Sequence, residues 1–117
     1  MDPIKRFISD DSLLGMLACM EQLRVLEREI PTQVVSVFLY IATHNPCHKQ
    51  AIEEDLDFTT ASCSRNIAWL SHTHRLGKPG LGLVETIKDP SNRRRYICSL
   101  TNKGKELTAS LEAKLYG

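Results

Sequence analysis

Two runs rich in β-branched and apolar residues, 83–88 and 95–100, interrupt a chain whose other ordered segments all show helical spacing. The residues between them begin with Asp89-Pro-Ser-Asn92, which has the chemistry of a turn. The sequence therefore predicts a hairpin, with Arg93, Arg94 and Arg95 close to its tip. A charged tip cannot bury itself, and adjacent cations repel one another unless an anion lies among them. This feature points to a polyanionic partner, nucleic acid above all.

Five helical stretches are predicted around the hairpin. The first is amphipathic, runs over about 12–29 and can be capped by Asp11 or Ser12; the second begins at Pro31, is almost wholly apolar and ends at His44-Asn45-Pro46. The third covers about 49–56, the fourth follows a Thr59 cap, and the last covers about 102–116 after a Thr101 cap. This order predicts a mainly α winged helix-turn-helix fold with a two-stranded antiparallel wing.

Length and composition favour one domain over residues 1–117. The chain is 42% hydrophobic and 25% charged, which is enough to build a core and gives no sign of disorder. Its longest nearly apolar run, 34–42, is far shorter than the roughly 20 residues of a membrane span. The first residues are followed by acids rather than by the apolar core of a signal peptide, so we expect a cytoplasmic protein.

Charge is unevenly divided along the chain. Residues 1–58 carry five basic and ten acidic side chains, a net charge of −5, whereas residues 59–117 carry ten basic and four acidic ones, a net charge of +6. An electropositive half beside an acidic remainder is typical of a nucleic-acid-binding protein, although solvated surfaces alone can produce it.

The fourth helix has the pattern of a recognition helix. Cys63, Ile67 and Leu70 form its apolar stripe, and small side chains with one arginine form the opposite face. Small side chains let a helix approach a surface closely, and Arg65 can then reach the O6 and N7 edge of guanine or a phosphate. The alternative is a solvated surface helix without a ligand. The candidate contacts are Thr60, Ala61, Ser62, Ser64, Arg65 and Asn66.

The segments Gly82-Leu-Val-Glu85, Asp89-Pro-Ser-Asn-Arg-Arg94 and Ser99-Leu-Thr-Asn-Lys-Gly-Lys-Glu-Leu107, together with the order of elements, resemble the winged helix-turn-helix regulators of the MarR type. The resemblance implies a homodimer on pseudo-palindromic duplex DNA, with Thr60, Ser62, Ser64 and Arg65 in the major groove. It also implies that Arg94, with Arg93 and Arg95, enters the minor groove, where narrow A·T-rich stretches attract arginine.

The chain departs from the family pattern in three places. Asn92 stands where an acid usually orients the wing arginine, so we expect Asp89 to take that role. The connection 75–82 is long and rich in glycine, and its Lys78 is a candidate phosphate contact. Little chain follows the start of the last helix, so we expect a dimer interface that is smaller than in the family, or a different one.

Two apolar stripes are candidates for that interface. They are wider than one small core requires, and we expect them to pair across a two-fold axis. The alternative is that the first helix packs on the second and last helices of its own chain. The stripes are Leu13, Leu17, Met20, Leu23, Leu107, Leu111 and Leu115.

Other chemistries find little support in the sequence. Cys19, Cys47, Cys63 and Cys98 lack C-x-x-C spacing and are expected to be reduced and buried. His44, His48, His72 and His74 are expected to be exposed rather than to bind zinc, and oxidant sensing by Cys19 or Cys63 is disfavoured. No motif for an enzyme, a cofactor or a metal is present.

Lys103 and Lys105 oppose the dipole of the last helix and suggest a nearby anion. We therefore expect a sequence-specific DNA-binding transcription regulator, a repressor acting as a homodimer, with an unknown small-molecule effector possible. The rival hypothesis is a winged-helix module that binds a protein of a transcription or replication complex.

Overall fold

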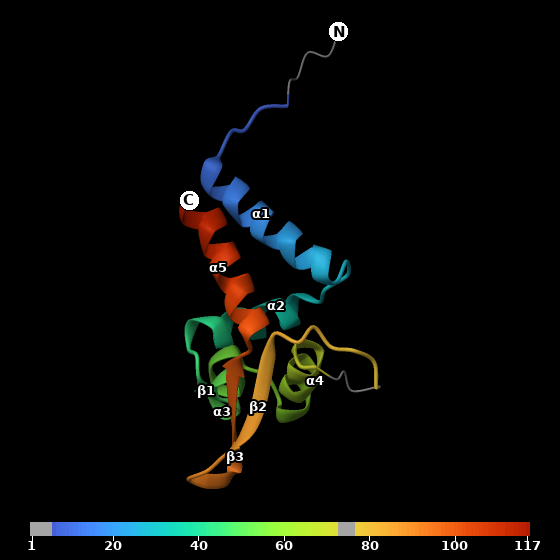
Figure 1. The fold of residues 1–117 in the computed structure, drawn as a ribbon, viewed down its shortest axis with the longest axis vertical. Coiled ribbons are helices and arrows are strands. Elements are labelled where there is room, and N and C mark those ends of the chain that lie inside the picture. Colours follow the sequence, from blue (N-terminus) through green and yellow to red (C-terminus); the bar gives the residue numbers. More distant parts are fainter. Residues whose placement is uncertain (1–5, 73–76) are drawn as a thin grey trace.

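The computed structural model describes residues 6–72 and 77–117, which form five helices and three strands. The element order is α1 (Asp11–Leu26), α2 (Thr32–Thr43), β1 (Cys47–His48), α3 (Lys49–Leu56), α4 (Thr60–Leu70), β2 (Val84–Asp89), β3 (Asn92–Leu100) and α5 (Asn102–Tyr116). The predicted winged helix-turn-helix architecture is confirmed. Figure 1 shows α1 and α5 side by side at one end, the β2–β3 wing at the other, and α2 between them.

Three helices begin where a side-chain oxygen can accept a backbone N–H. Asp10 accepts from Leu13 over 3.0 Å, Thr59 from Ser62 over 3.1 Å, and Thr101 from Gly104 over 3.1 Å. The last two caps are those predicted. The first helix is capped one residue earlier than predicted, and it ends at Leu26 rather than near residue 29.

The strands in the described part of the chain pair in the antiparallel order β1-β3-β2. β1 was not predicted, because two residues are too short to show a period; Cys47 lies opposite Cys98, and His48 lies opposite Ile97. β3 starts three residues earlier than predicted, so the arginines belong to the strand. Lys88 lies opposite Tyr96 but Asp89 lies opposite Asn92, which leaves 93–95 without a partner on β2 in the described hairpin.

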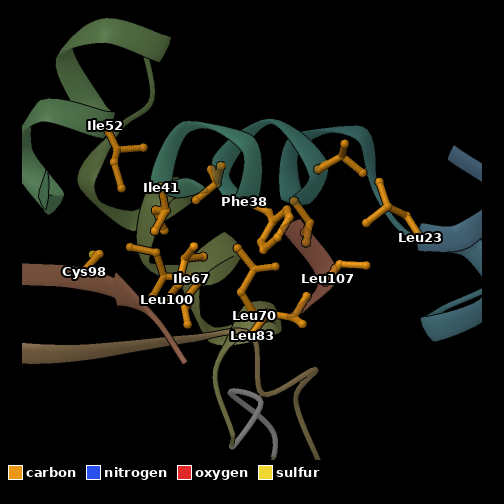
Figure 2. Packing of buried hydrophobic residues seen from close by; sticks show 14 of the residues in the cluster. Leu23, Phe38, Ile41, Ile52, Ile67, Leu70, Leu83, Cys98, Leu100 and Leu107 are labelled. Carbon is orange, nitrogen blue, oxygen red and sulfur yellow. The ribbon is translucent and has the colours of Figure 1, made fainter. Parts of the chain in front are cut away.

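The core is centred on α2, whose Phe38 and Ile41 are almost completely buried. Figure 2 shows them packed against side chains from α4, the wing and α5, among them Leu70, Leu83 and Leu107. Leu23 of α1 packs in the same cluster. Each fully buried side chain of this size contributes roughly 1.5–3 kcal/mol.

Leu83 stands where α4, β2 and α5 meet. Its N–H donates to the carbonyl of Leu70 over 2.8 Å, and its own carbonyl accepts from the N–H of Thr101 over 3.0 Å. A Cβ added to Gly104 would lie 2.1 Å from that carbonyl oxygen, so only glycine allows α5 to start this close to β2. This approach gives the Leu-Thr-x-x-Gly segment a structural role.

Among the described residues, none of the helices has both the length and the apolar character that a bilayer crossing needs.

Candidate nucleic-acid interface

Helices α3 and α4 form a helix-turn-helix unit joined by a tight turn. Asp57 closes α3 in the left-handed conformation with φ 56°, which turns the chain sharply. The N–H of Phe58 then donates to the carbonyl of Glu53 over 3.0 Å, and Thr59 caps α4. The start of α4 is therefore held firmly against the end of α3.

The outward face of α4 is the one that the sequence predicted. Thr60, Ala61, Ser64 and Arg65 are all exposed. Ala61, Ser64, Arg65 and Ala68 line a shallow depression on this face. Its small side chains leave room for the edge of a base pair, with Arg65 the one long donor among them.

Asn66, one of the predicted DNA contacts, is buried in the structure. It is only 6% exposed, and its Nδ2 donates to Oε1 of Gln33 in α2 over 3.2 Å. Ser62 is half-buried and its hydroxyl donates to the same oxygen over 3.4 Å. Asn66 follows Cys63 by three residues and precedes Leu70 by four, a spacing that already places it on the buried face.

A groove joins the recognition helix to the wing. Its lining comes from α3, from the start of α4 and from the wing, and comprises Lys49, Gln50, Glu53, Thr60, Arg94, Arg95 and Tyr96. Lys49 and Glu53 form an ion pair at its edge, and the hydroxyl of Thr60 donates to Glu53 over 3.3 Å. Sequence reasoning missed Lys49, Gln50 and Tyr96, because β1 is what brings the start of α3 beside the wing.

Arg93, Arg94 and Arg95 are all exposed on the unpaired part of β3. The side-chain oxygen of Asn92 accepts from the backbone N–H of Arg94 over 3.1 Å. Asn92 thus holds the backbone at Arg94, and the side chain of Arg94 remains exposed.

Asp89 does not take the predicted role of orienting the wing arginine. In the described residues, its Oδ2 lies 3.0 Å from Nε2 of His48, and its Oδ1 accepts from the N–H of Ser91 over 2.8 Å. The hydrogen bond from His48, then that from Ser91, hold the pKa of Asp89 below its ordinary value; nearby Arg95 acts in the same direction. The carboxylate therefore remains ionised and engaged within the wing.

Two lysines outside the helix-turn-helix unit have different surroundings. The Nζ of Lys103 donates to the carbonyl of Leu81 over 2.7 Å, which explains a cation in the first turn of α5 without an external anion. Lys78 is exposed in the connection between α4 and β2, whereas Arg75 lies outside the described residues. The end of this connection is tied to α4 by Leu81 N–H donating to the carbonyl of Trp69 over 2.9 Å.

The residues of the two predicted interface stripes fall into a buried group and an exposed group. Leu23, Leu107 and Leu111 are at most 7% exposed and belong to the core of their own chain. The Gln22 side chain bonds Ser110 over 2.8 Å, so α1 packs along α5 as the alternative held. Leu13, Leu17 and Leu115 are more than half exposed, and Met20 is half-buried.

The cysteines and histidines are the remaining candidates for other chemistry. The four cysteines are free thiols, with Cys63 and Cys98 buried, and burial is the main reason that the pKa of each rises to about 11. Among the described residues, no three His, Cys, Asp or Glu side chains are grouped to hold a metal ion. His44 stacks on Tyr40 with ring centroids 4.1 Å apart, while His74 lies outside the described residues.

The fold was compared with those of known proteins. No protein-family model and no curated protein sequence matches the chain. Solved structures do match: a MarR transcriptional regulator from Methanosarcina mazei Go1 aligns with a TM-score of 0.65 and 17% identity over 89% of this chain and 68% of that chain. Overoxidized AbfR bound to DNA aligns with a TM-score of 0.64 and 19% identity, covering 89% and 70%. The crystal structure of MarR aligns with a TM-score of 0.61 and 22% identity, covering 97% and 74%. The resemblance drawn from the sequence is confirmed in the fold.

Proposed function

We propose that the protein is a sequence-specific regulator of transcription that binds duplex DNA as a homodimer and acts as a repressor. The observation that carries the proposal is the continuous groove in which Thr60 of α4 and Arg94 and Arg95 of the wing share one lining. A duplex presents a major groove and an adjacent minor groove across one phosphate strand, and a helix and a wing that line one groove of the protein could contact both.

Recognition by α4 rests on its exposed face. Arg65 would bond the O6 and N7 atoms of a guanine, the pairing with the best geometry for a guanidinium. Thr60, Ala61 and Ser64 let the helix sit close to the base edges. Ser62 contributes less than the sequence suggested, since its hydroxyl is already bonded to Gln33.

Affinity would come mainly from the cations around the groove. The arginines of β3 would enter or flank a narrow minor groove, and Lys78 would meet a phosphate at the other side of the site. Lys49 can join them if a phosphate competes with Glu53 for its ammonium group. These contacts are independent of sequence and place the protein in register on the duplex.

The dimer would use the apolar side chains that α1 and α5 leave exposed. Leu13, Met16, Leu17 and Leu115 are each 51% or more exposed, an apolar surface that a partner copy would cover. To reach successive major grooves, a two-fold axis through this end would have to set the two α4 helices about 34 Å apart. The operator would then be an inverted repeat.

Selection of bound sites from random duplexes, followed by titration at several salt concentrations, tests the proposal. If each subunit neutralises about four phosphates, log K should fall against log[salt] with a slope of about −7. An enriched inverted repeat with that slope supports the proposal. A flat salt response, or no enriched site, would favour a module that binds a protein partner instead.

A further inference from the structure

The outer part of the wing has little lateral support. β1 flanks β3 only at Cys98 and Ile97, so in the described residues the hairpin continues toward its tip as two strands alone. Its register also breaks between Lys88 and Asp89. A two-stranded hairpin is marginally stable by itself, and a break in register weakens it further.

A side-chain contact between β1 and β2 links this outer part to the body of the domain. Nε2 of His48, at the end of β1, lies 3.0 Å from Oδ2 of Asp89 on β2. These two strands are not neighbours, because β3 lies between them. The contact therefore crosses the central strand and ties the far side of the hairpin to the start of α3. Only 12% of the Asp89 side chain is exposed, against 42% of the His48 side chain.

From Asp89, hydrogen bonds continue to the arginines. Its other oxygen accepts from Ser91 over 2.8 Å and so fixes the turn. Asp89 also lies opposite Asn92, whose side chain accepts from the backbone N–H of Arg94 over 3.1 Å. Since no residue of β2 pairs with 93–95 in the described hairpin, this path links the backbone of the arginines to the turn and, through His48, to β1.

We propose that His48 is a positioning residue for DNA binding: by holding Asp89, it sets the angle of the wing turn and thereby aims Arg94 at the duplex. The proposal rests on the proposed function. It assigns His48 no contact with DNA.

The charges around the pair favour this role. Lys49 and Glu53 of α3, the charged side chains nearest to β1 on that helix, satisfy each other in an ion pair. On β3, the positive charge of Arg95 also favours the ionised form of Asp89, whose pKa lies below its ordinary value. A carboxylate is a strong acceptor for a ring N–H, so the ionised Asp89 can hold the His48 side chain.

A double-mutant cycle on the selected duplex tests the coupling. His48→Ala should weaken binding roughly fivefold, the loss expected for one hydrogen bond. In the Arg94→Ala background, the same substitution should change the affinity less than about twofold. The matched control is His44→Ala, an exposed histidine at the end of α2, which should leave the affinity unchanged. Effects of His48→Ala and Arg94→Ala that multiply, or a His48→Ala variant with full affinity, would overturn the proposal.

Rescue by a conservative variant separates positioning from direct contact. The side-chain amide of His48→Gln keeps a donor for Asp89, so this variant should bind like wild type, which also guards against a folding defect in His48→Ala. Asp89→Ala should weaken binding as His48→Ala does, and His48→Ala should change the affinity less than about twofold in the Asp89→Ala background. If His48 touched a phosphate itself, His48→Ala would weaken binding equally in that background, and the positioning role would be wrong.

The binding of wild-type protein to the duplex distinguishes failure of the proposed function from failure of the role of His48. If wild-type protein enriches no duplex, both proposals fall before any variant is compared. If wild-type protein binds and only the coupling or the rescue by His48→Gln is missing, the DNA-binding proposal stands and the role of His48 falls.

Discussion

The side-chain amide of Asn66 donates to Oε1 of Gln33 over 3.2 Å, and this bond joins the recognition helix to the first turn of α2. Ser62 donates to the same oxygen over 3.4 Å. Two donors one helical turn apart, held by one acceptor, fix the rotation of α4 about its own axis. Arg65 therefore faces outward because its neighbours are held inward.

Arg65 is expected to read a base. Arg65→Ala should relax the preference at one base-pair position in each half-site, since a bidentate contact to guanine discriminates by ~1–3 kcal/mol. Titration of duplexes that differ from the selected site at single positions measures this. Arg24→Ala is the control, because Arg24 bonds Glu21 on α1 and should not affect recognition. Uniform weakening on every duplex would make Arg65 a phosphate contact instead.

Arg94 is expected to act differently. Arg94→Ala should weaken specific binding several-fold and reduce the magnitude of the salt slope by about 1 per subunit. The residue is exposed, so the unfolding midpoint in urea should remain that of wild type. Titrations over a range of salt concentrations check the slope. An unchanged affinity at every salt concentration would remove Arg94 from the interface.

Leu17 tests the dimer. It is 56% exposed on α1, so Leu17→Glu should produce a folded monomer if this face pairs with a second copy. Sedimentation at micromolar concentration measures the state. Leu23 is the matched contrast: it is 2% exposed in the core, and Leu23→Glu should unfold the domain rather than dissociate it. A Leu17→Glu variant that remains a dimer, or a monomeric wild type, would contradict the assignment.

Gly104 tests the junction at the start of α5. Alanine is better than glycine in a helix by about 1 kcal/mol. Gly104→Ala should nonetheless destabilise the domain by roughly 1–3 kcal/mol, because its Cβ would lie 2.1 Å from the Leu83 carbonyl oxygen. Urea unfolding measures the change. The control is Ala109→Gly at an exposed position of the same helix, where only the helix propensity should be lost. A stabilised Gly104→Ala variant would refute the close approach.

The buried thiols should be inert in the folded protein. Burial raises the pKa of Cys63 and of Cys98 to about 11, so both stay protonated at pH 8, and the thiolate is the reactive form. Alkylation by iodoacetamide at pH 8, followed by mass spectrometry, should label them only after unfolding. Labelling should accelerate as the pH approaches that value. Rapid labelling of the native protein at pH 8 would reopen oxidant sensing at these positions.

The local parts of the fold could be predicted from the sequence. The Thr59 and Thr101 caps and the turn at 89–92 depend on neighbours within a few residues, and such chemistry is visible in the chain itself. The outward face of α4 followed from the period of its apolar stripe. Asn66 was included among the candidate DNA contacts although it is buried, and its spacing from Cys63 and Leu70 already indicated the buried face.

The parts that depend on distant residues could not be predicted. An apolar stripe shows that a helix face is covered but not by what, so Leu23, Leu107 and Leu111 were assigned to a second chain although α1 packs on α5. The partner of Asp89 lies 41 residues away on a strand too short to show a pattern. The groove lined by Lys49 also depends on β1, so it could not be predicted from the sequence either.

The junction at Leu83 also gives the domain a mechanical property. Its amide holds the carboxyl end of α4, and its carbonyl holds the amino end of α5 through Thr101. A shift of α5 along its axis must either break the second bond or carry Leu83 with it, and then the first bond pulls on α4. These two backbone hydrogen bonds, with Leu83 between them, therefore couple the position of α5 to that of the carboxyl end of α4.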